Sequence, residues 1–342
     1  MLGWAGATLA TSLGAAALGL DKAAAQQAAA PEARFFRIGA GNLGGVNYPI
    51  ARALAQALSN PPGSPSCDKP GGCGVPDLVA VAQSTRGSIA NLQAIAGGSL
   101  DSAFVQADIA FWAFTGTRSF ADKAPLDALR AIANLFPEDL QIVVRKGAEV
   151  ETARDLKGKR VSLDEEGSGT LTTARLVLEA FGLGEADLQA RYVPPDQAVS
   201  AMQDGSLDAM FLFAGFPAPA ISELAQNVAI DLVPIAGPPA EALRRQYGFF
   251  STDVVPVGTY KGVTRTETLS VGAQWLTSAK LPEPLVHDIT AALWSETTRQ
   301  ALDKSNPHAK LIRLDTALKG LAVPLHPGAE RYYRDAGLLK SN

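Results

Sequence analysis

Histidine and cysteine are scarce in this sequence, which excludes most of the familiar site chemistries. Its 342 residues include 3 His and 2 Cys. The histidines, at positions 287, 308 and 326, show no metal-ligand spacing such as His-x-x-x-His. The motif at 167–169 is Gly-Ser-Gly, not the Gly-x-Ser-x-Gly of a nucleophile elbow. The sequence therefore predicts no metal, no catalytic residue and no cofactor.

Charge is also sparse, and it is not clustered. Charged residues make up 19% of the chain, the net charge is -4, and no Lys/Arg-rich run occurs. A nucleic-acid-binding protein would be expected to carry a basic patch, so this class is excluded. Hydrophobic residues reach 47%, which is ample for packed cores, and the length suggests two domains.

Long apolar runs are absent after residue 34, whereas one occupies the N-terminus. Residues 4–20 are apolar and rich in Ala and Gly, and Ala23-Ala24-Ala25 follows as a small-x-small cleavage pattern. This is typical of a secretory signal peptide over 1–25, although no Lys or Arg precedes the apolar run. A disordered Ala-rich tail is the alternative. We expect the mature protein to be periplasmic.

The two cysteines, Cys67 and Cys73, lie in a loop rich in Pro and Gly. Export would place them in an oxidising compartment, where a local disulfide is the natural interpretation. A metal site is the alternative, but no His or second Cys pair lies nearby.

The same supersecondary pattern occurs twice along the chain. In the first copy, strand-like runs at 35–40, 78–82 and 103–106 alternate with helical patterns at 48–58 and 88–96. In the second, strands at 160–164, 190–193 and 209–213 alternate with helices at about 171–181 and from 194. Gly-Ser-Leu-Asp stands at the same place in both copies, at 98–101 and 205–208.

Alternating strands and helices predict an α/β fold with mainly parallel sheets, here in two lobes that face each other across a cleft. Residues 129–144 are expected to form strand–turn–strand around Pro137-Glu138-Asp139 and to enter the second lobe. Residues 268–276 are expected to return, and helices at 283–304 and 327–336 to pack on the first lobe. The predicted division is lobe I, 34–135 with 262–342, and lobe II, 136–261. Oligomeric state is not predicted.

A glycine-rich turn precedes the first helix of each copy, where ligands bind in open α/β sheets. Gly44-Gly45 and Gly167-Ser168-Gly169 allow close backbone approach, and helix N-termini favour negative charge. The predicted hydroxyl donors are Ser84, Thr85, Ser88, Ser168 and Thr170, and the predicted apolar walls are Tyr48, Phe111, Trp112, Phe136 and Phe213. The alternative is that the turns are tight connections and the hydroxyls ordinary caps.

Gly39-x-Gly41-x-x-Gly44 also matches a dinucleotide fingerprint between a strand and a helix. The acidic residue expected at a second strand end is missing, since Gln83-Ser84 stands there. A dinucleotide-dependent enzyme is therefore kept only as an alternative.

Six segments together resemble the TAXI group of solute receptors, which serve tripartite ATP-independent periplasmic (TRAP) transporters. They are Gly39 to Pro49, Ser84 to Leu92, Asp101 to Asp108, Asp155 to Val161, Gly167 to Thr170 and His326 to Tyr333. The first turn departs from the family at Asn42-Leu43 and Val46-Asn47, and the cysteine loop is not general in the family.

The resemblance implies a type II periplasmic-binding-protein fold without enzymatic activity. It implies a small carboxylate ligand, such as glutamate or 2-oxoglutarate, and delivery to TRAP membrane subunits. A sensing module for a signalling receptor is the alternative. The contacts implied are Gly44, Gly45, Asn47, Tyr48, Ser84, Thr85, Ser88, Gln106, Gly167, Ser168, Thr170 and Phe213. Arg86 is the only arginine among the matched contacts, so we expect N–H groups and hydroxyls to dominate recognition.

Overall fold

The structure is a computed structural model that describes residues 32–64 and 74–340. The predicted signal peptide and the predicted Cys67–Cys73 disulfide lie outside these residues. None of the helices in the described part of the chain is long and apolar enough to cross a membrane.

The first repeat folds as the hydrophobic pattern predicts. Its elements are β1 (Arg34–Gly39), α1 (Asn47–Leu58), β2 (Ser59–Asn60), β3 (Val75–Pro76), β4 (Leu78–Gln83), α2 (Ser88–Ala96), β5 (Ser102–Gln106), α3 (Ala107–Thr115) and the 3₁₀ helix η1 (Arg118–Phe120). β4, β1 and β5 are parallel neighbours. α1 buries Ile50, Leu54 and Leu58, the face expected from their spacing.

The second repeat and the segment after it form lobe II. Its elements are η2 (Ala153–Leu156), β7 (Arg160–Ser162), α4 (Gly169–Ala180), η3 (Glu185–Asp187), β8 (Gln189–Arg191), α5 (Pro195–Gln203), β9 (Ala209–Ala214), α6 (Pro219–Asn227), β10 (Ile230–Val233), α7 (Gly237–Gln246) and β11 (Ser251–Val255). β7 is parallel to both β8 and β9, so the repeat has the same parallel core as the first.

The two Gly-Ser-Leu-Asp junctions make the same contacts in both lobes. Asp101 accepts hydrogen bonds from the backbone N and the Nε of Arg37, both at 2.8 Å. Asp208 accepts from the backbone N of Arg160 at 2.9 Å and from its Nε at 3.0 Å. In both cases the aspartate's own N–H donates back to the arginine carbonyl. The repeat seen in the sequence is therefore a repeat of the structure.

The prediction of strand–turn–strand at 129–144 is wrong. β6 (Leu129–Arg145) is one strand of 17 residues that runs through Pro137, Glu138 and Asp139 without turning. The proline is tolerated because pairing with β9 begins only at Asp139 and because the pairing with β12 shifts register nearby.

β6 and its antiparallel neighbour β12 (Thr266–Ser278) carry the sheet from one lobe to the other. The order is β3-β2-β4-β1-β5-β12-β6-β9-β7-β8, with β10 beside β6 and β11 beside β12. Parallel pairing holds within the repeats, whereas the connecting strands pair antiparallel, so the sheet is mixed.

Between the lobes the sheet narrows to two strands, a segment that we call the waist. Pro137 and Glu138 of β6 pair there with Gly272 and Val271 of β12. β5 pairs with β12 only from Ala273 onwards, and β11 pairs with it only up to residue 270. The predicted lobe boundary between residues 135 and 136 is close to the waist, whereas the one between residues 261 and 262 lies before β12 begins.

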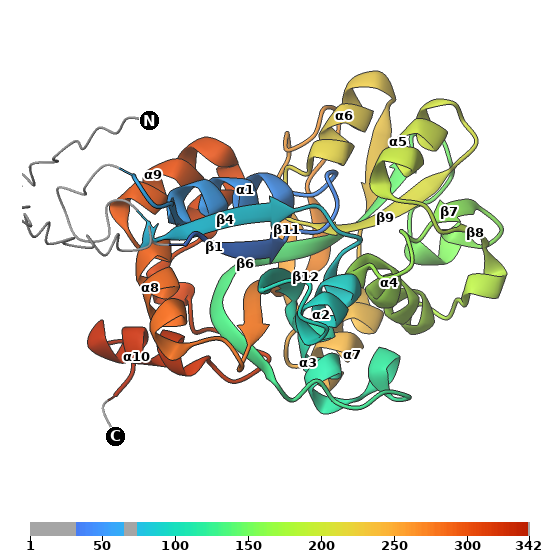
Figure 1. Ribbon diagram of the computed structural model, residues 1–342. Coiled ribbons are helices and arrows are strands. Elements are labelled where there is room, and N and C mark those ends of the chain that lie inside the picture. Colours follow the sequence, from blue (N-terminus) through green and yellow to red (C-terminus); the bar gives the residue numbers. More distant parts are fainter. Residues whose placement is uncertain (1–31, 65–73, 341–342) are drawn as a thin grey trace, which may run out of the picture.

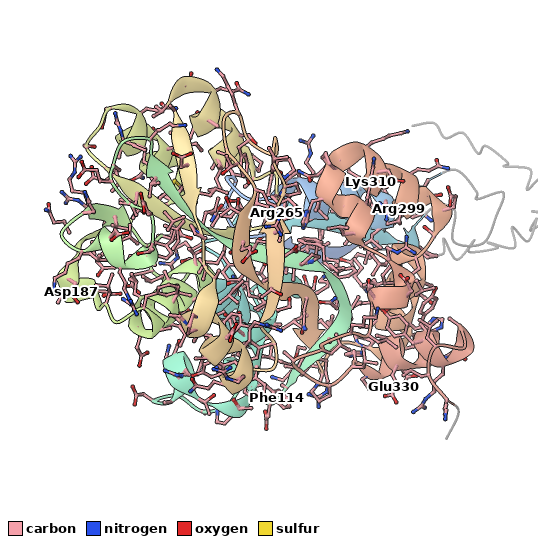
Figure 2. All side chains as sticks on the ribbon, turned by 180° about the vertical axis from the view of Figure 1, so that it is seen from behind. Phe114, Asp187, Arg265, Arg299, Lys310 and Glu330 are labelled. Atoms are coloured by element: carbon pink, nitrogen blue, oxygen red, sulfur yellow. The ribbon has the colours of Figure 1, made fainter. Side chains whose placement is uncertain are left out.

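The C-terminal helices cover lobe I (Figure 1). They are α8 (Glu283–Leu293), α9 (Glu296–Ser305), η4 (Pro307–Leu311), η5 (Leu314–Thr316) and α10 (Pro327–Asp335). The single helix expected over 283–304 is divided, since Ser295 caps α9 by accepting from Thr298 N. Leu285, Ile289 and Leu293 join the core formed by α1, β1 and β4, as predicted. Seen from behind, Arg299 and Lys310 lie at the lobe I end and Asp187 at the far end of lobe II (Figure 2).

Candidate functional site

A small polar cavity lies where the two lobes meet, with a volume of ≈ 40 Å³. Lobe I lines it with the turn before α1, the turn before α2 and the end of β5, and lobe II lines it with the start of α4 and the end of β9. The waist contributes Glu138. The cavity therefore has walls from both lobes and from the strands that join them.

Four helices begin at this cavity. Asn47 opens α1, Ser88 opens α2, Gln106 is the residue before α3, and Gly169 opens α4, and all four line the cavity. Each helix N-terminus carries partial positive charge from its unpaired N–H groups and the helix dipole. Their convergence makes this part of the cavity favourable for an anionic group.

Glycine at 169 lets the two lobes approach closely. A Cβ built on Gly169 would lie 1.4 Å from Gln106 Oε1 and 2.6 Å from its Cδ, so the buried Gln106 amide would have to shift to admit a side chain here. Gly87 has φ +122 and would place a Cβ 3.2 Å from Ser168 Cα. The turns of opposite lobes are thus in contact through their backbones.

Hydrogen bonds hold the lobes together around the cavity. Ala90 N of lobe I donates to Gly167 O at 3.0 Å, and Ala220 N of lobe II donates to Gly44 O at 3.1 Å. Deeper inside, Thr173 Oγ1 donates to Asp108 Oδ2 at 2.7 Å. The structure is therefore a closed form of the two-lobed molecule.

Seven of the twelve predicted contact residues line the cavity. They are Gly45, Asn47, Ser88, Gln106, Ser168, Thr170 and Phe213. The glycine-rich turns and the strand ends therefore meet as the topology of open α/β sheets requires.

The other five lie beside the cavity rather than in its wall. Gly44 and Gly167 supply the carbonyls of the hydrogen bonds between the lobes. Ser84 Oγ donates to Gly41 O at 3.2 Å, and Thr85 Oγ1 accepts from Gly41 N at 3.0 Å, so both brace the first turn. Tyr48 is half-buried against the lobe I core.

The aromatic walls expected from the sequence are mostly elsewhere. Phe136 lies in the lobe I core. The ring of Trp112 packs edge-on against the ring of Phe249, with 5.6 Å between the two ring centroids. Phe111 is 40% exposed and also faces Phe249. Phe213 is the one predicted aromatic that reaches the cavity.

Two buried carboxyl groups in the cavity were not among the predicted contacts. Glu138 and Asp164 both line it, and each is 2% exposed. The sequence predicts a turn at Glu138 and, at Asp164, only the end of a strand. An acidic residue within or directly after an apolar strand was the available signal, because such a side chain is rarely buried without a role.

Burial changes the protonation of these groups. Desolvation raises the pKa of Glu138 to about 8, and Asp108 adds to the rise while the hydrogen bond from Asn47 opposes it. Desolvation raises the pKa of Asp164 to about 7, against the effects of the Glu165 N–H and the nearby Thr170 and Ser168 hydroxyls. Asp164 also has φ 72, a strained value for a residue other than glycine.

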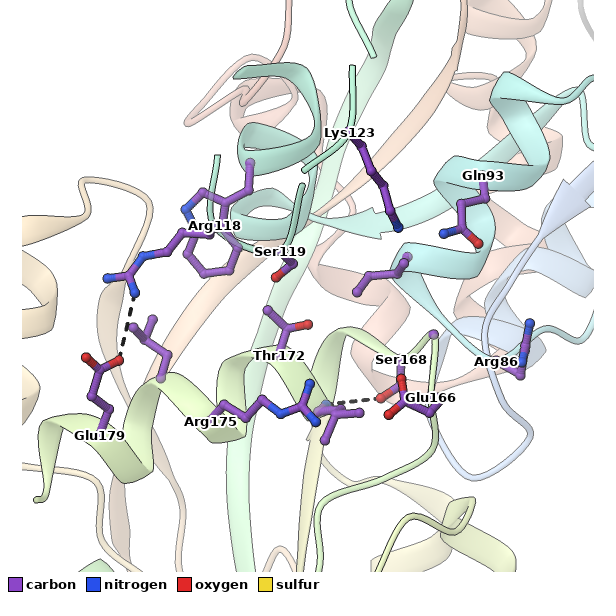
Figure 3. Close-up of a pocket in the computed structure, with 15 residues that line it drawn as sticks. Arg86, Gln93, Arg118, Ser119, Lys123, Glu166, Ser168, Thr172, Arg175 and Glu179 are labelled. Atoms are coloured by element: carbon purple, nitrogen blue, oxygen red, sulfur yellow. Dashed lines mark hydrogen bonds and ion pairs between the residues drawn. The ribbon is translucent and has the colours of Figure 1, made fainter. Parts of the chain in front are cut away.

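A wider groove of ≈ 670 Å³ adjoins the cavity, bounded by α2 and η1 of lobe I and by α4 of lobe II. Figure 3 shows Lys123, Ser119 and Gln93 facing Thr172 and Arg175 across it. Arg86 is exposed and lines both the groove and the cavity. The groove is therefore a solvent-filled approach to the turn at 167–168.

The glycine-rich turn at 39–44 leaves little space for a dinucleotide. Gly44 faces the other lobe, where an added Cβ would lie 2.9 Å from Pro195 Cβ, and Gly39 packs against Leu100 and Asn91. Within residues 32–64 and 74–340, no group of three or more His, Cys, Asp or Glu side chains could hold a metal ion.

Comparison with known proteins agrees with this architecture. PhnD1 from Prochlorococcus marinus (MIT 9301), solved with methylphosphonate, is similar at 13% identity over 89% of this chain and 99% of that chain, with a TM-score of 0.51. The alkanesulfonate-binding protein SsuA from Xanthomonas axonopodis pv. citri, bound to MOPS, is similar at 18% identity over 91% and 96%, with a TM-score of 0.49. The similarity to PhnD1 confirms the predicted two-lobed α/β periplasmic-binding-protein fold. The family model described as NMT1-like matches residues 38–337, and the chain belongs to the NMT1-like family.

Proposed function

We propose that this protein is a periplasmic solute-binding protein that captures a small carboxylate and delivers it to a membrane transporter. The observation that carries the proposal is the cavity between the lobes, where four helix N-termini converge on a space closed from both sides. The converging N-termini favour a negatively charged group, and separation of the lobes would open the space of ≈ 40 Å³ to a small ligand. No step of chemistry is assigned to it.

The mechanism is cleft closure. Ligand bound to one lobe supplies contacts for the other, and it shifts the population toward the closed form because it binds that form better. The hydrogen bonds Ala90–Gly167 and Ala220–Gly44 then form around it. The membrane partner would recognise the closed arrangement of the two lobes.

Two further observations support the proposal. The fold is shared with PhnD1, a protein solved with the small anion methylphosphonate. The segments that resemble TAXI receptors include the turns at 44–48 and 167–170, which meet at the cavity. A TRAP membrane permease is accordingly the proposed partner, and glutamate and 2-oxoglutarate are the proposed ligand types.

A thermal-shift screen tests this function. Amino acids, di- and oxo-carboxylates, sugars and nucleotides would each be added to the purified protein, and a ligand at 100 times its Kd adds about 2.7 kcal/mol to the free energy of unfolding. We expect shifts with carboxylates alone. A shift with nucleotides or sugars and none with carboxylates would refute the proposal.

Paired arginine variants then locate the ligand. Arg86 lines the cavity as well as the groove, whereas Arg118 lines the groove alone. Because Arg86 is exposed, we expect Arg86→Ala to weaken carboxylate binding by less than about tenfold, or 1.4 kcal/mol, and Arg118→Ala to leave it unchanged. Abolished binding in Arg86→Ala would show that an arginine dominates recognition, and loss in Arg118→Ala would move the ligand to the groove.

A further inference from the structure

The carboxyl groups of Glu138 and Asp164 in the cavity indicate a narrower class of ligand than the proposed function, on which this inference rests. Glu138 comes from the waist and Asp164 from the end of β7, so two separate elements each bury a carboxyl group against the same small space. Neither takes part in any ion pair recorded among residues 32–64 and 74–340.

The hydrogen bonds of these two groups are incomplete. Asn47 Nδ2 donates to Glu138 Oε1 at 2.9 Å, and Glu165 N donates to Asp164 Oδ1 at 2.8 Å. Asp164 Oδ2 is buried and has no hydrogen-bond partner of normal geometry, and the same holds for Asn47 Oδ1 and Asn42 Oδ1. The cavity therefore presents acceptors from both lobes that need donors.

A buried donor without an acceptor lines the same cavity. Gln106 Nε2 is a buried donor without a partner, because Ser88 Oγ occupies only the Oε1 of that amide. It lies among the helix N-termini described above. The cavity thus holds a group that requires an acceptor or a negative charge, Gln106 Nε2, together with groups that require donors or a positive charge.

We propose that the ligand is a zwitterion, whose carboxylate lies at the helix N-termini and whose protonated amine binds Glu138 and Asp164. A buried carboxylate is stable only when it is paired, and a ligand ammonium supplies both the charge and the N–H donors. A ligand with acceptors alone would place its oxygens against Asp164 Oδ2 and Asn47 Oδ1.

The competing possibility is that both carboxyl groups stay protonated and donate to an oxygen-rich ligand. The raised pKa values of Glu138 and Asp164 make the neutral forms accessible near pH 7. The two possibilities differ in which partner of an amino/oxo pair is preferred, since 2-amino and 2-oxo acids differ at a single substituent.

The test is calorimetric titration of the purified protein with L-glutamate and 2-oxoglutarate, alanine and pyruvate, and phenylalanine and phenylpyruvate. In the pair that binds, we expect the amino acid to bind at least tenfold more tightly than its oxo acid. Glu138→Gln and Asp164→Asn should each weaken amino-acid binding by tenfold or more and leave or improve binding of the oxo acid.

Asp139→Asn is the matched control. Asp139 is fully buried on the same strand but does not line the cavity, so its isosteric replacement should leave the preference unchanged. Tighter binding of the oxo acid, or no effect of Glu138→Gln and Asp164→Asn, overturns the zwitterion and keeps the proposed function. Binding of neither member of any pair overturns both.

Discussion

The turns before α1 and before α4 occupy equivalent positions in the two repeats, yet they differ in what they offer to a ligand. The lobe I turn presents the amides of Asn42 and Asn47, and its helix has no side-chain cap. The lobe II turn presents the carboxyl of Asp164, and Ser168 caps its helix by accepting from Leu171 N at 3.0 Å. Equivalent positions of the two repeats therefore supply amide groups in lobe I and a carboxyl group in lobe II.

Preventing the two turns from meeting should have the largest effect. Gly169→Ala places a methyl group onto Gln106 Oε1, and overpacking of this kind costs about 1–3 kcal/mol. Since the clash exists only in the closed form, we expect ligand affinity to fall about 5- to 150-fold with little change in the melting temperature of the free protein. Titration calorimetry and thermal unfolding measure the two quantities.

Gly184→Ala is the control for this variant, because an added Cβ there meets only Asp187 Oδ2 at 3.9 Å. Unchanged affinity in Gly169→Ala would mean that the ligand-bound form does not bring α4 against Gln106.

Loss of the hydrogen bond between Thr173 and Asp108 should have the second largest effect on ligand affinity. Thr173→Val removes the donor to a fully buried carboxyl and leaves Oδ2 unpaired, at a cost of about 1–3 kcal/mol to the closed form. We expect a loss of affinity and a larger radius of gyration by small-angle scattering at equal ligand concentration. Thr172→Val, one residue earlier and facing the groove, should change neither.

The carboxyl groups of Glu138 and Asp164 predict how ligand affinity responds to pH. Burial in the closed form raises the pKa of Glu138 to about 8 and that of Asp164 to about 7, so both are largely protonated at pH 6. A ligand ammonium favours their ionised forms, and affinity for an amino acid should therefore rise between pH 6 and pH 8.5 with release of protons. Titrations in buffers of different ionisation enthalpy measure that release.

The other titratable groups around the waist are Asp108 on α3, Asp139 on β6, Asp253 on β11 and His308 on η4, and Arg86 before α2 adds a positive charge at the cavity. Burial raises the pKa of Asp139 and lowers that of His308, which favours their neutral forms. Glu138→Gln should flatten the pH profile, while Asp139→Asn should keep it. Affinity that falls as pH rises would instead assign proton donation to the two carboxyl groups.

Substitutions at Asn47 and Tyr48, which are adjacent in the chain, should differ least in their effect on ligand affinity. Asn47 lines the cavity, whereas Tyr48 rests on the lobe I core. We expect Asn47→Ala to weaken binding severalfold and Tyr48→Phe to leave the Kd unchanged in the same titration. Equal losses in both would place the ligand closer to the lobe I core than the cavity is.

Much of the fold was predictable because local patterns decide it. The strand–turn–helix order of both repeats follows from apolar runs and glycine-rich turns, and β1, β4, β5, β7, β8 and β9 lie where strands are expected. The sequence did not predict β2, β3, β10 or β11. β6 was predicted wrongly because Pro137-Glu138-Asp139 has the composition of a turn, and only its pairing with β12 keeps it extended. Tertiary pairing outweighed local preference there.

The site was partly predictable for a topological reason. Helix starts after parallel strands gather at one edge, and for this reason Gly45, Ser88 and Ser168, predicted as ligand contacts, all lie in the cavity wall. Glu138 could not be located in this way, because its position depends on a strand that crosses between lobes. Tyr48 follows directly after a cavity residue, yet the rotation of α1 turns it toward the core.

The two-stranded waist has a mechanical consequence. A ribbon of two strands twists more than a wide sheet, so a rotation of one lobe against the other would be taken up by the backbone of β6 and β12. Glu138 lies in this ribbon. A ligand that binds Glu138 would therefore act close to the axis of such a rotation, where a small change in curvature becomes a large displacement at the outer rims of the lobes.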